Sequence, residues 1–108
     1  MVHHLPYIVD LDTEDLDYPS LQEWVEAHAL IMDSLVLEGS EIMLIDETID
    51  SITLIEFWLD NDVAALVDLT RDGIKEALGN NMAHWATREE YGKAAKARDL
   101  LEKLNKRK

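Results

Sequence analysis

The two signs of charge are separated along this chain, and this separation constrains the fold more than any other feature. Residues 1–70 contain 17 Asp and Glu and not one Lys or Arg, whereas residues 71–108 contain ten Lys and Arg and six Asp and Glu. The two parts carry −17 and +4, which gives the net charge of −13. We therefore expect the basic C-terminal segment to lie beside the acidic body and to reduce its self-repulsion.

The same separation limits the partners that the chain can bind. Nucleic acid is not expected, because binding would bring carboxylates against phosphates. A basic protein is the complementary partner, and an acidic decoy that imitates DNA is one form of this hypothesis. The chain has no cysteine, which excludes a disulfide framework and a thiolate metal site. It has no run of 18 apolar residues and no export signal, so we expect a cytoplasmic protein without a membrane segment.

The spacing of apolar residues predicts helices through most of the chain. Ser20 and Glu23 form a capping box at the start of the first helix, and Gly39 is its expected end. The expected helices cover residues 20–39, 41–59, 63–78 and a C-terminal segment from about residue 88. The β-branched content of 41–58 makes two strands the competing interpretation, but its polar residues do not alternate, which favours a helix.

These expectations combine into an all-α fold. A chain of 108 residues is one domain by size, and short connections favour antiparallel neighbours. We therefore predict a single bundle of four to five mostly antiparallel helices. It comprises an extended acidic N-terminal segment (1–18), an acidic helical body (20–81) and a C-terminal hairpin end with a basic helix (82–108). The apolar run 7–9 in the first segment could pair as an edge strand, but we expect it to lie extended over the helices.

The segment 82–104 carries the most specific motif in the sequence. Thr87 and Glu90 form a second capping box, which predicts that a helix begins at about Arg88 and folds back on the preceding one. Around this box stand, at fixed spacing, Met82, Ala86, Tyr91, Ala94, Ala95, Arg98, Asp99, Leu101 and Leu104. This spacing resembles the UVR motif, the short helical hairpin of the excision-repair helicase subunit and of its nuclease partner.

The resemblance implies association between helical hairpins, either with another protein or with a second copy in a homodimer. The contact residues that it implies are Tyr91, Ala95, Arg98, Asp99, Leu101 and Leu104. The apolar members would form a contact ridge, and Arg98 and Asp99 would give it polar specificity. The alternative interpretation is a capped amphipathic helix that packs into the core of its own chain.

Two pairs of carboxylates point to a different function. Glu23 and Glu26 lie three residues apart, as do Glu47 and Asp50, so each pair shares one face of its predicted helix. In an antiparallel pair of helices that turns near Gly39, the four carboxylates converge as an oxygen site for Mg²⁺. This arrangement is similar to the MazG-type nucleoside triphosphate pyrophosphohydrolases, which implies Mg²⁺ on a triphosphate and attack by water. The alternative is that all four carboxylates are solvated.

The sequence thus favours a small, non-enzymatic adaptor without a cofactor, which associates through its C-terminal helix with a protein partner or with itself. A Mg²⁺-dependent pyrophosphohydrolase and an acidic DNA mimic are the two alternatives. Small size and acidity are also typical of phage or bacterial accessory proteins.

Overall fold

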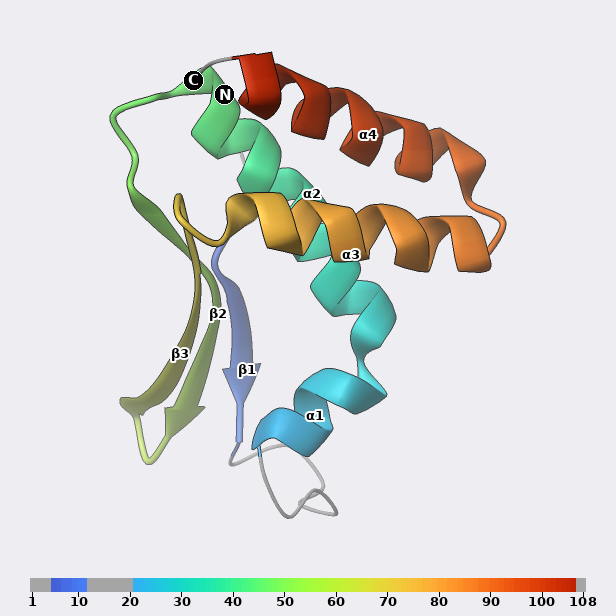
Figure 1. The fold of residues 1–108 in the computed structure, drawn as a ribbon. Coiled ribbons are helices and arrows are strands. Elements are labelled where there is room, and N and C mark those ends of the chain that lie inside the picture. Colours follow the sequence, from blue (N-terminus) through green and yellow to red (C-terminus); the bar gives the residue numbers. More distant parts are fainter. Residues whose placement is uncertain (1–4, 12–20, 107–108) are drawn as a thin grey trace.

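The chain adopts a mixed α/β fold, seen in a computed structural model that describes residues 5–11 and 21–106 (Figure 1). Its elements are β1 (Tyr7–Asp10), α1 (Leu21–Ala27), α2 (Ala29–Ile45), β2 (Ser51–Leu59), β3 (Asp62–Thr70), α3 (Ile74–Thr87) and α4 (Tyr91–Lys106). The strands form one sheet in the order β1-β2-β3, with β1 parallel and β3 antiparallel to β2. The predicted all-α bundle is therefore wrong.

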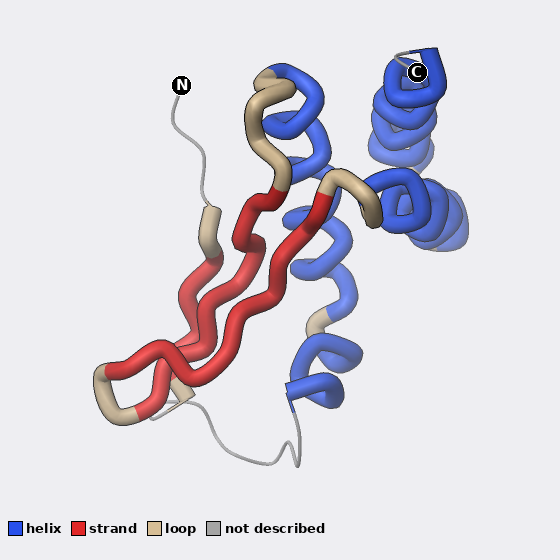
Figure 2. The backbone as a smooth tube through the Cα atoms, turned by 60° about the vertical axis from the view of Figure 1, so that its left-hand side comes forward, coloured by secondary structure: helices blue, strands red, loops and turns tan. Residues whose placement is uncertain are grey.

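The described helices all lie on one face of the sheet (Figures 1 and 2). Helix α2 packs on β2 and β3, and the hairpin of α3 and α4 packs on α2. On α1, the ring of Trp24 meets Phe57 of β2 edge-to-face, with 5.4 Å between ring centroids. Both side chains are buried, so this contact fixes which face of β2 belongs to the core.

The β2–β3 hairpin replaces most of the two helices predicted over 41–59 and 63–78. Asp60 and Asn61 join the strands with φ of 53° and 64°. A two-residue loop with both φ values positive matches the twist of paired strands, and Asp and Asn tolerate this conformation better than most residues. Because the loop is so short, it brings the two apolar runs together as a hairpin.

Irregular pairing explains why the alternation expected of strands is missing from the sequence. The register between β2 and β3 shifts between Thr53 and Ile55, so that Leu54 is an extra residue on β2. Leu54 and Ile55 are consecutive, yet both are buried. A β-bulge allows this, because it interrupts the period of two along one strand.

Several predicted helix ends lie elsewhere. The predicted helix 20–39 is divided at His28, where φ is −114° and ψ is 38°. Gly39 does not end a helix, since α2 continues to Ile45. Gly73 precedes α3 instead of lying within a helix, and Gly79 lies inside α3.

Gly39 is instead a point of close approach between α2 and β2. A Cβ atom built on Gly39 would lie 2.7 Å from Cδ2 of Leu54, which is itself buried. We expect Gly39→Ala to lower the free energy of unfolding by about 1 kcal/mol, because overpacking outweighs the better helix propensity of alanine. Urea unfolding measures this change.

The control for this prediction is Gly79→Ala in α3, where an added Cβ meets no atom within 4 Å. That variant should be more stable by roughly 0.5–1 kcal/mol, from helix propensity alone. Equal stabilisation by both substitutions would contradict the close approach at Gly39.

The prediction that two C-terminal helices fold back on each other is confirmed. Helices α3 and α4 pack together along their length as a hairpin (Figure 1). The predicted capping box is not formed, because α3 continues through Thr87, whose hydroxyl donates to the carbonyl of Ala83 at 2.9 Å. Glu89, with φ of 63°, forms the turn, and α4 begins at Tyr91.

The expected pairing of the basic segment with the acidic body is also confirmed. Lys96 of α4 lies 3.0 Å from a carboxylate oxygen of Glu41 on α2. Arg88, in the α3–α4 turn, forms an ion pair of 2.7 Å with Asp33 of α2. The two charged parts of the sequence therefore meet along α2.

The N-terminal segment, predicted as extended over the helices, contributes an edge strand instead. Tyr7 pairs with Ile55 and Val9 with Phe57, in parallel register. Val9 is buried and shares the inner face of the sheet with Phe57. The other parts of the predicted segment, 1–4 and 12–18, lie outside the described residues.

Candidate protein-binding face of the sheet

The face of the sheet turned away from the helices is the best candidate for a functional surface, and we call it the outer face. Paired residues share a face, and successive residues alternate between faces. Since Phe57 points to the helices, Glu56 and Trp58 point to the other side. By this register the outer face carries Ile8, Asp10, Thr53, Glu56, Trp58, Val63, Leu66 and Asp68.

Large apolar side chains on the outer face are exposed. Ile8 is 53% exposed and Leu66 is 51% exposed, on either side of Glu56 in one row across the three strands. Val63, paired with Trp58, is 45% exposed. Within the described chain no helix or strand covers this face (Figure 2). Grouped apolar side chains on a surface are typical of a protein-binding site.

Carboxylates accompany these apolar side chains. The indole of Trp58 donates to Glu56 at 3.0 Å, and the hydroxyl of Thr53 donates to Asp68 at 2.8 Å. These hydrogen bonds hold both carboxylates in place on the outer face. All three strands come from the part of the sequence that has no Lys or Arg. The outer face is therefore apolar and acidic, which suits a partner that is apolar and basic.

Arg71, the first basic residue after β3, is turned away from the outer face. Its guanidinium donates to the backbone carbonyls of Met43 at 3.0 Å and of Asp46 at 3.2 Å. The hydroxyl and the amide of Thr48 both donate to the Asp46 carboxylate, and these bonds, with the charge of Arg71, lower the pKa of Asp46. The cation thus belongs to the end of α2 and leaves the acidity of the outer face unchanged.

The residues predicted for the contact ridge of α4 do not share one surface. Leu104 is buried in the core, and Leu101 is half-buried and packs against it. Ala95 is half-buried, whereas Tyr91, Arg98 and Asp99 are exposed. Arg98 lies 3.3 Å from its neighbour Asp99. The apolar spacing of the UVR-like segment thus serves in large part to pack α4 on its own chain.

The four carboxylates predicted to hold Mg²⁺ are not brought together. Glu23 and Glu26 lie on α1, whereas Glu47 and Asp50 lie in the loop between α2 and β2. Helix α2, with 17 residues, separates the two pairs by roughly 25 Å. In residues 5–11 and 21–106 no group of three or more Asp, Glu or His side chains is placed to hold a metal ion.

An Asp–His pair invites comparison with a catalytic site. Nδ1 of His84 lies 2.9 Å from a carboxylate oxygen of Asp33, the geometry that orients the base in a catalytic triad. Two hydroxyls lie near these residues in sequence, but Ser34 donates to the Leu30 carbonyl and Thr87 donates within α3. Neither hydroxyl serves as a nucleophile for His84, so the pair is best explained as a link between α2 and α3.

Comparison with protein-family models, with curated proteins and with solved structures finds no match for this chain. In the described part of the chain, no helix is both long enough and apolar enough to cross a membrane.

The outer face was missed in the sequence because it exists only once the strands are recognised. The available signal was Asp60-Asn61 between two apolar runs, because Asp and Asn tolerate the positive φ that a two-residue hairpin loop requires. Which face the helices leave bare depends on tertiary packing, and no local sequence signal specifies it.

Proposed function

We propose that this chain is a non-catalytic protein-binding protein that uses the outer face of its sheet. The observation that carries the proposal is the one-sided fold, which leaves Ile8, Val63 and Leu66 exposed among carboxylates. A partner surface with apolar side chains ringed by Lys or Arg would bury the exposed apolar side chains of the outer face and pair with its carboxylates. Within this proposal the protein acts in the cytoplasm, as expected from the sequence.

The earlier alternatives receive less support. Association through α4 would have to use the exposed Tyr91, Arg98 and Asp99, since Leu101 and Leu104 contribute to the core. The pyrophosphohydrolase hypothesis requires four carboxylates to converge. The two pairs lie instead at opposite ends of α2. The decoy hypothesis is compatible with the outer face, because a DNA-binding protein is one kind of basic partner.

Introducing a positive charge into the apolar part of the outer face tests the proposal. We expect Leu66→Lys, alone and combined with Ile8→Lys, to weaken partner binding by at least about tenfold, because truncating or repelling a central apolar contact costs 2 kcal/mol or more. Both side chains are exposed, so circular dichroism and thermal unfolding should change little. The measurement is quantitative capture from an extract of the source organism, at low and high salt, followed by titration of the enriched partner.

Tyr91→Lys on α4 is the matched control, since it places the same new charge at a 65% exposed apolar residue far from the sheet. Binding to the outer face predicts that the partner is retained by Tyr91→Lys and lost by Leu66→Lys. The reverse result would transfer the function to α4 and refute the outer face.

A further inference from the structure

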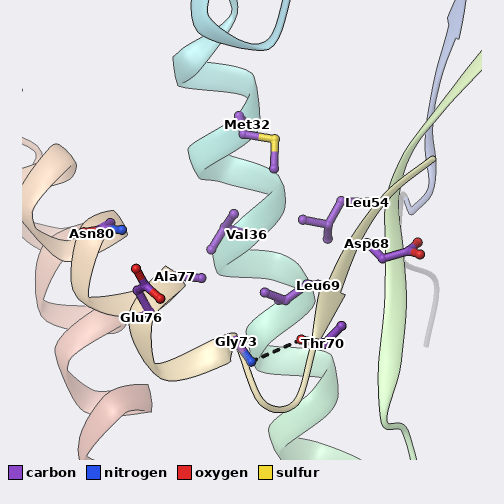
Figure 3. A pocket seen from close by; sticks show the side chains of 10 residues that line it. All are labelled: Met32, Val36, Leu54, Asp68, Leu69, Thr70, Gly73, Glu76, Ala77 and Asn80. Carbon is purple, nitrogen blue, oxygen red and sulfur yellow. Dashed lines mark hydrogen bonds between the residues drawn. The ribbon is translucent and has the colours of Figure 1, made fainter. Parts of the chain in front are cut away.

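A groove lies along the other side of β3, between this strand and α3 (Figure 3). Its hollow measures about 320 Å³, and helix α2 forms its floor. The groove, which we call the edge groove, is lined by Met32, Val36, Leu69, Glu76, Ala77 and Asn80. Its floor is apolar, and its α3 wall carries one carboxylate and one amide.

Within the described sheet, the strand beside this groove has a free edge. β3 is the last strand of the described sheet, with β2 as its neighbour on one side only. Its nine residues carry Asp62 and Asp68 but no Lys, Arg or Pro, the residues that most often block strand pairing at an edge. The register irregularity on β3 lies near the hairpin tip, between Ala65 and Val63, which leaves the stretch beside the groove regular.

The ladder pattern identifies which backbone groups point away from β2. Beyond the end of β3, the amide of Arg71 donates to the carbonyl of Asp50 at 2.8 Å. Because residues bonded to the neighbouring strand alternate along an antiparallel ladder, Leu69 and Val67 also bond to β2. The N–H groups of Leu66, Asp68 and Thr70 therefore point to the free edge, at the mouth of the edge groove.

We propose that the edge groove binds an extended basic–apolar peptide segment of a partner protein, which adds to β3 as a fourth strand. Main-chain hydrogen bonds to Leu66 and Asp68 would hold the segment, while every second side chain enters the groove. The apolar floor of Met32, Val36 and Leu69 suits a branched aliphatic side chain. The proposal goes beyond the outer face, because it uses the edge of β3 and its inner side.

Charge favours a basic segment over a second copy of this chain. A partner strand on β3 lies beside Asp62 and Asp68, and it faces Glu76 across the groove. Two copies would each bring a net charge of −13. If two β3 strands paired antiparallel about Ala65, Asp62 would also lie directly opposite Asp68, where like charges destabilise the pair. Lys and Arg in the added segment have no such conflict.

The test uses a fluorescein-labelled peptide of alternating valine and lysine, nine residues long like β3, and anisotropy measured against the full chain. Asp68→Pro is compared with Asp68→Ala, since both lose the carboxylate and only proline loses the outward N–H. Proline is tolerated on an edge strand where the N–H faces solvent. We expect Asp68→Pro to bind about tenfold more weakly than Asp68→Ala.

A second pair of variants tests the groove without altering the strand. Ala77→Phe fills the edge groove and should weaken peptide binding, whereas Ala83→Phe, at an exposed site on the same helix, should not. Amide hydrogen exchange provides a third measurement that does not depend on folding of a variant. Bound peptide should protect the amides of Leu66 and Asp68 in the wild-type chain.

Three results would overturn the proposal. One is equal binding by Asp68→Pro and Asp68→Ala without protection of the Leu66 and Asp68 amides, which would indicate attraction by charge alone. Another is equal binding of the matched valine–glutamate peptide. The third is a dimer in light scattering that Asp68→Pro converts to a monomer, which would make a second copy the occupant. Retained partner capture by the outer face would, in each case, leave the proposed function standing.

Discussion

Replacing Arg71 by alanine is expected to lower the free energy of unfolding by about 3 kcal/mol, although this side chain is only half-buried. Its guanidinium joins the end of β3 to the stretch 43–49, which lies 22 to 28 residues earlier in the chain. It donates to the carbonyls of Met43 and Asp46 at the end of α2 and, through both Nε and Nη2, to the carbonyl of Ile49 before β2.

The size of the effect follows from where these carbonyls lie. The last carbonyls of a helix have no partner within the helix, and a cation at this end also interacts favourably with the helix dipole. Alanine at position 71 would leave the carbonyls of Met43, Asp46 and Ile49 without their charged donor. Hydrogen bonds to charged groups contribute about 1.5–3 kcal/mol each, and water can replace only part of that contribution at a half-buried site.

Thermal and urea unfolding of Arg71→Ala would measure the loss, which corresponds to roughly 10–20 °C in Tm. Arg71→Lys should be intermediate, because an ammonium keeps the charge but cannot reach several carbonyls with one planar fork. Lys75→Ala, at an exposed position nearby, should change the stability by less than about 0.5 kcal/mol. An Arg71→Ala variant as stable as Lys75→Ala would show that water satisfies these carbonyls equally well.

The sequence predicted those parts of the fold that depend on charge and on local helix periodicity. Lys96 beside Glu41 and Arg88 beside Asp33 follow from the absence of Lys and Arg before residue 71. The α3–α4 hairpin follows from helical spacing in the last quarter of the chain. The helical spacing is a property of residues close together in sequence. The ion pairs result from long-range attraction between a basic segment and an acidic one.

The sheet was not predicted because apolar and polar residues do not alternate regularly along its strands. The run from Ile52 to Trp58 has two adjacent buried residues at the bulge, so apolar positions do not alternate there. Asp50, just before this run, lies three residues from Thr53, and this spacing imitates one face of a helix. The turn residues Asp60 and Asn61 were better evidence than the periodicity, since Asp and Asn tolerate the positive φ that both positions adopt in the hairpin loop.

The candidate site depended even more on tertiary structure. Glu47 and Asp50 could lie near Glu26 only if the chain turned back at Gly39. It does not turn there, because α2 continues to Ile45. Exposure of Leu66 and burial of Leu69, both in one strand, depend on which side α2 covers. Residue types alone could not distinguish these two leucines.

The second large effect is expected where the α3–α4 turn joins α2. The side chain of Asp33 is only 8% exposed, and its carboxylate contacts Arg88 at 2.7 Å and His84 at 2.9 Å. The guanidinium of Arg88 also lies over the ring of Trp85, 5.0 Å from its centroid. A buried carboxylate needs such partners, because desolvation of an unpaired charge is costly.

Replacing Arg88 by alanine should therefore lower the free energy of unfolding more than replacing Asp33. Arg88→Ala removes the ion pair of the buried Asp33 carboxylate and the contact of Arg88 with Trp85, so we expect a loss of about 2–3 kcal/mol. Asp33→Ala should cost less, about 1 kcal/mol, because the side chains of His84 and Arg88 are 55% and 30% exposed, and the buried Nη1 of Arg88 can turn toward water once the carboxylate is removed. The Asn81 amide also keeps its bond of 2.8 Å to the backbone carbonyl of residue 33 in that variant.

A double-mutant cycle measures this asymmetry directly. Urea unfolding of Arg88→Ala, Asp33→Ala and the double variant should give a coupling free energy of at least about 1 kcal/mol, since the double variant no longer buries an unpaired charge. Arg98→Ala serves as the control, because its ion pair with Asp99 is exposed and contributes little. Additive losses, or a larger loss for Asp33→Ala than for Arg88→Ala, would mean that burial of the carboxylate is not what makes the Arg88 contact important.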